Sequence, residues 1–318
     1  MYGLDKRDIG MIRALDFDAR VSISSLARKI RISKEVANYR LKRLIKEKVI
    51  KGFIAIIDSY MLGYHLYRVQ VRLKKADDKI IGEIIAWAKS NPFISSIVTL
   101  DGKWDLELAF WSQNPSEFNQ LYEAFVMRFG SRIQRKTISI ILQLEHLPYN
   151  FLYDNPSNDG LLVGTVDHLV IDDHDRAILV ALSKNCRTPL IEIAMGTGLT
   201  ANAVKYRIRS LEKKRIIKGY STILNTEYFK LSHYRVMLFL SNPSMKRQAH
   251  SFLKAQKDVL LISQLIGAAD IRFEILCDSP LRIYRLIDEL NCSFPDLVRD
   301  YDEIITKQEE VMDFFPHK

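Results

Sequence analysis

The sequence SKEVANYRLKRL (residues 33–44) reappears 167 positions later as TANAVKYRIRSL (residues 200–211). Each copy opens with a hydroxyl side chain that can cap a helix, and each then places apolar residues at positions i, i+4 and i+7. This spacing predicts a helix that packs one stripe against a core and leaves its opposite face to polar side chains. The chain therefore carries two helices of the same design, one in each half.

The similarity extends far beyond this helix. Residues 4–73 align with residues 171–240 without a gap and are identical at 18 of 70 positions. It resumes where Gly102-x-x-Asp105 matches Gly267-x-x-Asp270 at a spacing of 165. Because the period is too long for a solenoid repeat, we interpret it as a tandem duplication of a unit of about 150 residues.

Composition places the chain among ordinary globular proteins. Of its 318 residues, 47% are hydrophobic and 27% are charged, which excludes disordered, collagen-like and coiled-coil classes. No apolar stretch approaches the roughly 18 residues that span a bilayer, and the first residues lack a signal peptide's apolar run, so we expect a cytoplasmic protein. The three cysteines are widely spaced, and the seven histidines form no ligand cluster. We therefore predict no disulfide, no metal site, no cofactor and no catalytic residue.

The net charge of +9 is concentrated in two segments. Residues 4–60 hold 14 Lys and Arg against 7 Asp and Glu, and residues 171–227 hold 10 against 6. The two segments therefore carry +7 and +4, which leaves −2 for the remainder. A compact basic segment is what a polyanion-binding module needs, although solvated helix faces produce the same bias.

Each basic segment reads as three short helices followed by a strand. The second helix is predicted to begin near Ser22 in the first copy and at Thr188-Pro189 in the second, with Pro at the first helical position. Residues 51–57 and 218–224 look like a strand of a wing hairpin opened by Gly. Two angled helices, the second with an exposed polar face, match a helix-turn-helix that places its recognition helix in the major groove.

The polar face of the third helix supplies the candidate DNA-binding residues. Asn can pair with adenine, and Arg or Lys with guanine. The candidates for the groove are Lys34, Glu35, Asn38, Tyr39 and Lys42 in the first copy, with Asn202, Lys205, Tyr206 and Arg209 in the second. A further set, predicted to contact phosphates or to support the helix, is Arg40, Arg43, Lys51, Arg207 and Lys218.

These motifs resemble the N-terminal winged helix-turn-helix of the Lrp/AsnC, or feast/famine, transcription regulators of archaea and bacteria. The resemblance rests on Leu4-Asp5-x-x-Asp8, Arg20, Leu26-Ala27, Ser33-x-x-x-Ala37-x-x-Arg40-Leu41-x-x-Leu44 and Val49-Ile50-x-Gly52-Phe53, and on the same columns from Ile171 to Tyr220. The chain departs from the family pattern where Lys48 and Arg215 replace a usual Gly, and where Phe229-Lys230 stands in place of Leu62-Gly63. We call each winged helix-turn-helix segment a head. The second head is therefore expected to bind DNA more weakly than the first.

The rest of each unit reads as strand, helix, strand, strand, helix, strand. This order gives a ferredoxin-like sandwich and an α+β fold class. It resembles the family's C-terminal RAM domain, which binds effectors and mediates oligomerisation. The predicted domains are 1–60 and 169–228 for the winged helices, 61–146 and 229–318 for the sandwiches, and 147–168 for a linker. Because a helix-free sheet face needs a cover, we expect the copies to form a pseudo-dimer, with further homo-oligomers left open.

The resemblance also implies a site for an amino-acid-like effector at the sandwich hairpins. Its candidates are Gly102, Asp105, Gly267 and Asp270. The alternative is a tight hairpin that needs Gly for its backbone geometry and Asp to accept hydrogen bonds from nearby amides.

The turn-rich linker, with Pro148 and Gly160, is long enough to let the second head sit on the far side of the paired sheets. Two unlike heads on one duplex predict an asymmetric operator in double-stranded DNA.

Two alternatives to a two-headed regulator remain. Siroheme decarboxylases resemble Lrp/AsnC proteins and occur as paired or fused copies, but they tend to place His before the hairpin turn and Asn-Leu-Trp after it. Residues 98–106 and 264–271 keep Gly-x-x-Asp instead. The second alternative is an assembly partner with only one active DNA-binding head, motivated by Ala201 at the column of Lys34 and by the lower charge of the second segment.

Overall fold

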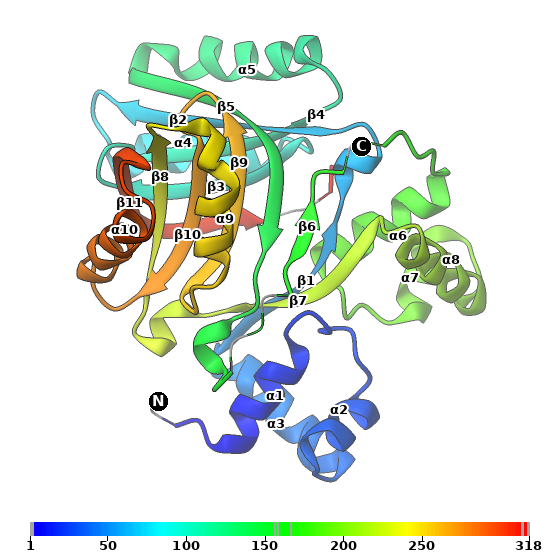
Figure 1. Cartoon of the computed structure of the whole chain (residues 1–318). Helices are drawn as coiled ribbons and strands as arrows, with labels where there is room; N and C mark the ends of the chain where they lie inside the picture. The colour runs from blue at the N-terminus through cyan, green and yellow to red at the C-terminus, as the bar shows by residue number, and fades with distance from the viewer. Residues whose placement is uncertain (1–2, 156, 158, 166, 313–314, 317–318) are drawn as a thin grey trace.

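The computed structural model describes residues 3–155, 157, 159–165, 167–312 and 315–316 (Figure 1). It contains two helical heads. The first consists of α1 (Lys6–Leu15), α2 (Ile23–Ile30), α3 (Lys34–Lys46) and β1 (Ile50–Ile57). The second consists of α6 (Asp173–Lys184), α7 (Leu190–Thr197), α8 (Ala201–Lys213) and β7 (Ile217–Leu224). Among the described residues, no helix is long and apolar enough to cross a membrane.

Most helices of the two heads begin at a side chain that accepts hydrogen bonds from the first turn, and α7 is the exception. Asp5 and Asp172 cap α1 and α6, and Ser33 and Thr200 cap α3 and α8. The predicted start of α7 is wrong in detail. Pro189 is the N-cap residue instead of the first helical residue, and the Thr188 hydroxyl donates to the carbonyl of Asn185.

The predicted wing hairpins are not present, because β1 pairs antiparallel with β7 of the other head. Phe53 lies opposite Thr222, and Ile54 lies opposite Ser221. Among the described residues, neither strand pairs with another strand of its own head. A single two-stranded ribbon, the head ribbon, therefore joins the heads.

The sheet regions together form one closed barrel. The first unit contains β2 (His65–Leu73), α4 (Asp78–Lys89), β3 (Ile94–Asp101), β4 (Leu106–Ser112), α5 (Pro115–Phe129) and β5 (Ile133–His146). The second contains β8 (Ser232–Leu240), α9 (Lys246–Lys254), β9 (Val259–Ile266), β10 (Ile271–Cys277), α10 (Leu281–Ser293) and β11 (Val298–Met312). The strand order is β2-β4-β3-β11-β8-β10-β9-β5-β6, and a further β2–β5 pairing closes it. These elements confirm the predicted α+β class.

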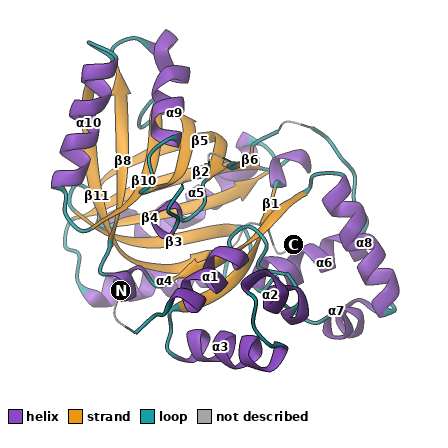
Figure 2. Ribbon diagram, turned by 60° about the horizontal axis from the view of Figure 1, so that its bottom comes forward, coloured by secondary structure: helices purple, strands orange, loops and turns teal. Residues whose placement is uncertain are grey.

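The two units meet through both their strand edges and their helix-free faces. The edge pairs are β3 with β11 and β5 with β9. The helices lie outside, as Figure 2 shows for α9 and α10, which pack on the strands of the second unit. The sheet faces without helices therefore line the barrel interior, which is how a duplicated sandwich covers them without a second chain.

The expected position of the second head is wrong. The heads are neighbours joined by the head ribbon, and they do not lie on opposite sides of the sheets (Figure 1). The segment predicted as a linker is also partly built into the fold, because β6 (Leu161–Val163) pairs with the end of β5. Positions 156, 158 and 166 of this segment lie outside the described residues.

This connecting segment is fastened to the first head at Asp16. The backbone amide of Tyr149 donates to Asp16 Oδ2 at 2.9 Å, and the Tyr153 hydroxyl lies 3.4 Å from the same oxygen. Asp16 Oδ1 is buried and has no hydrogen-bond partner in the part of the chain that the structure describes. Burial raises the pKa of Asp16 from 3.8 to about 6.

Replacing Asp16 with Asn should stabilise the protein at neutral pH. The folded state holds the Asp16 proton more tightly than the unfolded state, so its contribution to stability is complete below about pH 4 and is lost as the pH rises through 6. Asp16→Asn keeps an acceptor for the Tyr149 amide and cannot ionise. Urea unfolding should show a gain of up to about 3 kcal/mol at pH 7.5 and no gain below pH 4. The exposed Asp154→Asn is the control, and destabilisation by Asp16→Asn at pH 7.5 would contradict the assignment.

Candidate nucleic-acid interface

The predicted groove-facing side chains of both heads lie on the surface. All five candidates on α3 are exposed, and so are the four on α8. Tyr39 and Tyr206, which occupy the same column of the repeat, are 68% and 76% exposed. The opposite face of each helix is buried in the core, through Ala37, Leu41 and Leu44 in α3. The burial pattern therefore leaves the polar columns free to contact a ligand as large as a duplex.

The arginines of the same helices have a different role. Arg40 Nη1 lies 2.8 Å from both Asp5 Oδ2 and Asp8 Oδ1, and Arg43 Nη2 lies 2.5 Å from Asp8 Oδ2. Arg207 repeats this arrangement with Asp172 and Asp175. These ion pairs tie α3 to the start of α1 and α8 to the start of α6. Of the two roles predicted for Arg40, Arg43 and Arg207, these contacts favour supporting the helix over contacting phosphates.

The two lysines that follow the recognition helices also differ. Lys51 is exposed and available to a phosphate. Lys218 Nζ lies 3.1 Å from the fully buried carboxylate of Asp58. Asp58 also accepts hydrogen bonds from the backbone amides of Gly164 and Thr165. Lys218 therefore neutralises a buried carboxylate that also bonds the connecting segment. Phosphate contact stays a prediction for Lys51 alone of these two lysines.

A reciprocal pair of arginines fixes the heads to each other. Arg20 donates from Nη1 to the carbonyls of Cys186 and Thr188 in the second head. Arg187 donates from Nη1 to the carbonyls of Ala19 and Val21 in the first. Since the two residues occupy one column of the repeat, the contact has the reciprocity of a two-fold interface.

A groove runs along this seam between the heads. Four positively charged side chains line it, namely Arg20, Arg187, Lys205 and Arg209. Glu212 also lines it and carries a negative charge. Lys205 and Arg209 are exposed groove-facing candidates of α8. The positive side chains of the second recognition helix are thus continuous with the junction of the two heads.

The effector candidates are occupied by contacts within the fold. Asp105 Oδ2 accepts from the Leu73 amide at 2.7 Å, and Asp270 Oδ2 accepts from the Leu240 amide at 2.8 Å. Gly102 and Gly267 have φ of +121° and +117°, and a Cβ on Gly267 would lie 2.4 Å from the carbonyl oxygen of Ile138. The geometry supports the tight-hairpin alternative for all four residues.

Sequence reasoning missed a cluster of charged residues inside the barrel. His233, Glu274 and Glu309 place ligand atoms within 4.8 Å of one another, a pattern that could hold a metal ion. However, Arg235 bonds Glu309 at 2.5 Å and Arg272 bonds Glu274 at 2.8 Å. These carboxylates are already neutralised by guanidinium groups, which disfavours a cation. The sequence signal was the alternation of charged with apolar residues along the predicted strands.

Comparison with known proteins identifies the heads. A sequence profile described as winged helix-turn-helix DNA-binding matches residues 4–51 and 171–218. The HTH-type transcriptional regulator LrpA of Pyrococcus horikoshii is 46% identical over 56 residues, which cover 18% of this chain and 40% of that protein. Each head therefore matches a winged helix-turn-helix DNA-binding domain, and part of the chain is similar in sequence to LrpA.

The remaining similarities cover more of the chain at lower identity. YezC of Bacillus subtilis, an uncharacterised HTH-type transcriptional regulator, is 28% identical over 118 residues, which cover 37% of this chain and 84% of YezC. The siroheme decarboxylase NirDL superimposes on 97% of this chain and 93% of its own length, with a TM-score of 0.63 and 12% identity. At this identity the superposition shows a shared fold. The chain thus spans about two fifths of the length of LrpA, and the fold match extends over both halves.

The aspartates that hold the arginines should contribute unequally to stability. The Asp8 side chain is 1% exposed and serves two arginines, whereas Asp175 is 13% exposed and serves one. Removing one partner of a buried ion pair leaves an uncompensated charge. Asp8→Ala should lower the free energy of unfolding by about 3 kcal/mol and Asp175→Ala by about 1 kcal/mol in urea titrations. Equal losses would contradict this ranking.

Proposed function

We propose that the chain is a sequence-specific DNA-binding transcriptional regulator whose two heads read two unlike half-sites of one duplex. The observation that carries this proposal is the repeated polar column on α3 and α8, exposed in both heads while the opposite faces are buried. Basic side chains and aromatic residues on such a helix suit the major groove and its flanking phosphates. The matches to winged helix-turn-helix regulators support the same function.

The differences between the heads determine what each can read. The column that holds Asn38 in α3 holds Lys205 in α8, and the column of Lys42 holds Arg209. Asn favours adenine, whereas Lys and Arg favour guanine. The two half-sites should therefore differ in sequence. The reciprocal arginine contacts and the head ribbon should keep their spacing constant.

Fluorescence anisotropy with the chain's own upstream DNA and a shuffled duplex tests this function. We expect a preference of more than about tenfold for the natural sequence and a steep loss of affinity with salt. Lys42→Gln and Arg209→Gln should each weaken binding and flatten the salt dependence, because each removes a positive charge near the phosphates. Lys79→Gln, an equal change of charge on the exposed surface of α4, should leave both unchanged.

The outcomes separate the alternatives. If Lys205→Gln and Arg209→Gln leave affinity and footprint intact while Lys42→Gln does not, the second head is silent and the chain is an assembly partner with one active head. Failure to bind either duplex would overturn the proposal.

The fold shared with NirDL makes a siroheme-binding enzyme the second candidate. A change in siroheme absorbance on adding the protein would support it, and no change would reject this second candidate.

A further inference from the structure

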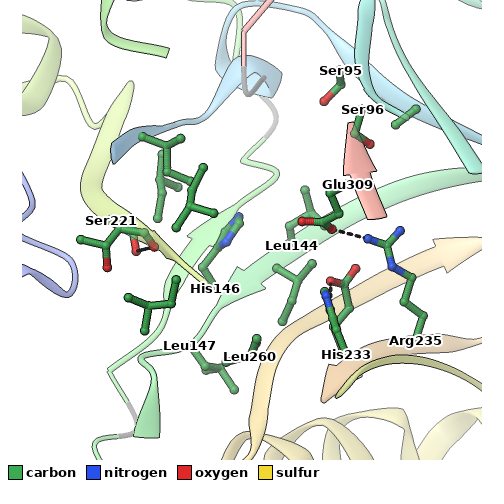
Figure 3. A pocket seen from close by; sticks show the side chains of 18 of the residues that line it. Ser95, Ser96, Leu144, His146, Leu147, Ser221, His233, Arg235, Leu260 and Glu309 are labelled. Atoms are coloured by element: carbon green, nitrogen blue, oxygen red, sulfur yellow. Dashed lines mark hydrogen bonds and ion pairs between the residues drawn. The ribbon is translucent and has the colours of Figure 1, made fainter. Parts of the chain in front are cut away.

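A cavity of about 170 Å³ lies where the head ribbon meets the barrel. Its lining includes Ile54 and Ile56 of β1 and Ser221 of β7, together with residues of several barrel strands. Figure 3 shows His146, His233, Arg235 and Glu309 on the barrel side of this space and Ser221 on the side of the head ribbon. The cavity is thus enclosed jointly by the part of the molecule that joins the heads and by the barrel.

The charged residues at the barrel end form ion pairs, and those of Arg68 are the longest. Arg235 lies 2.8 Å from Glu107 and 2.5 Å from Glu309, and Arg272 lies 2.8 Å from Glu274. Arg68 Nη1 is 3.9 Å from both Glu107 and Glu274, which is beyond hydrogen-bond distance. Its Nε and Nη1 are buried and have no hydrogen-bond partner among the described residues. Arg68 is also one of the residues that line the cavity.

Thr222 of the head ribbon also lines the cavity, and its hydroxyl is a second buried group without a partner among the described residues. Arg272 also has an unpaired Nε and Nη1, but its side chain is fully buried and does not line the cavity. Glu274 and Glu309 do line the cavity, and each already bonds to an arginine. An unpaired buried guanidinium N–H is costly, so a ligand oxygen at Arg68 would remove an existing penalty.

The other walls define what else the ligand needs. Leu66, Trp111 and Leu144 form an apolar surface beside Arg68. Burial lowers the pKa of His146 to about 4, so its ring is neutral at pH 7 and adds no charge. A mostly apolar pocket with a few convergent polar groups is the usual form of a small-molecule site.

We propose that this cavity binds a small carboxylate with an apolar body, whose carboxyl group accepts hydrogen bonds from Arg68. The apolar body lies against Leu66, Trp111 and Leu144. This site is separate from the hairpin residues Asp105 and Asp270, whose carboxylates hold backbone amides.

The consequence for DNA rests on the proposed function. Because Ile54, Ile56 and Ser221 belong to the head ribbon, an occupied cavity changes the packing beneath the strands that set the spacing of the heads. A ligand shifts such an equilibrium only by its difference in affinity for the two arrangements. Carboxylate binding should therefore alter DNA affinity, in a direction set by which head spacing the operator requires.

Isothermal titration calorimetry of the full chain with acetate, hexanoate and benzoate, and with hexanamide and benzamide as uncharged matches, tests the site. We expect hexanoate or benzoate to bind at least about tenfold more tightly than its amide. Arg68→Gln should remove that preference. Arg285→Gln, the same change at an exposed position on α10, should keep it.

A second variant guards against misfolding of Arg68→Gln. Ser96→Leu adds apolar volume at a lining residue and changes no charged side chain, and it should also abolish carboxylate binding. Binding of none of the three carboxylates to the wild type, equal binding of acid and amide, or undiminished binding by a folded variant would each overturn the site. DNA anisotropy with and without the carboxylate is a separate readout. Carboxylate binding without any DNA binding would retain the site and reject the regulator.

Discussion

The pairing of β1 with β7 is the constraint on which the rest of the molecule depends. Each strand leaves its own head without a partner and finds one in the other head, so neither head is complete alone. The apolar residues behind these strands form one core that includes Leu15, Leu44 and Leu182, contributed by both heads. The interface between the two heads is therefore an internal layer of a single chain, and the connecting segment, fastened at Asp16, belongs to the same layer.

Fusion of the two copies permits them to differ. In a homodimer each substitution appears twice, whereas here Lys51 stays exposed while its counterpart Lys218 bonds the buried Asp58. The arginine contacts that join the heads have stayed reciprocal, at Arg20 and Arg187. The arginine contacts between the heads are thus matched, while the surface columns differ, as at Asn38 and Lys205. That combination suits a fixed spacing between two unlike DNA-reading surfaces.

Local features of the fold were predictable from the sequence, and contacts between the halves were not. Capping residues and apolar spacing place α3 and α8 correctly because those signals lie within a few residues of each helix. The wing hairpins were predicted wrongly, because strand pairing depends on partners more than 160 residues away. The exposed polar columns of α3 and α8 were predicted from the helical spacing and the repeat, and DNA contact stays a prediction for them. Phosphate contact was one option predicted for Arg40 and Arg207, because the sequence of one helix does not reveal their aspartate partners on α1 and α6. The charged residues around Arg68 were missed for the same reason, since they come from several strands.

The central claim is that the two heads form one rigid unit, and a distance between spin labels on the heads tests it most directly. Lys46→Cys and Lys213→Cys place labels at the exposed ends of α3 and α8, with Cys292→Ser removing the exposed native thiol. Cys186 and Cys277 are buried, and burial raises their pKa to about 12 and about 11, so they should react slowly with the label. Double electron–electron resonance on the free protein should give a single narrow distance distribution. A broad or bimodal distribution would show that the heads move independently and would contradict the account.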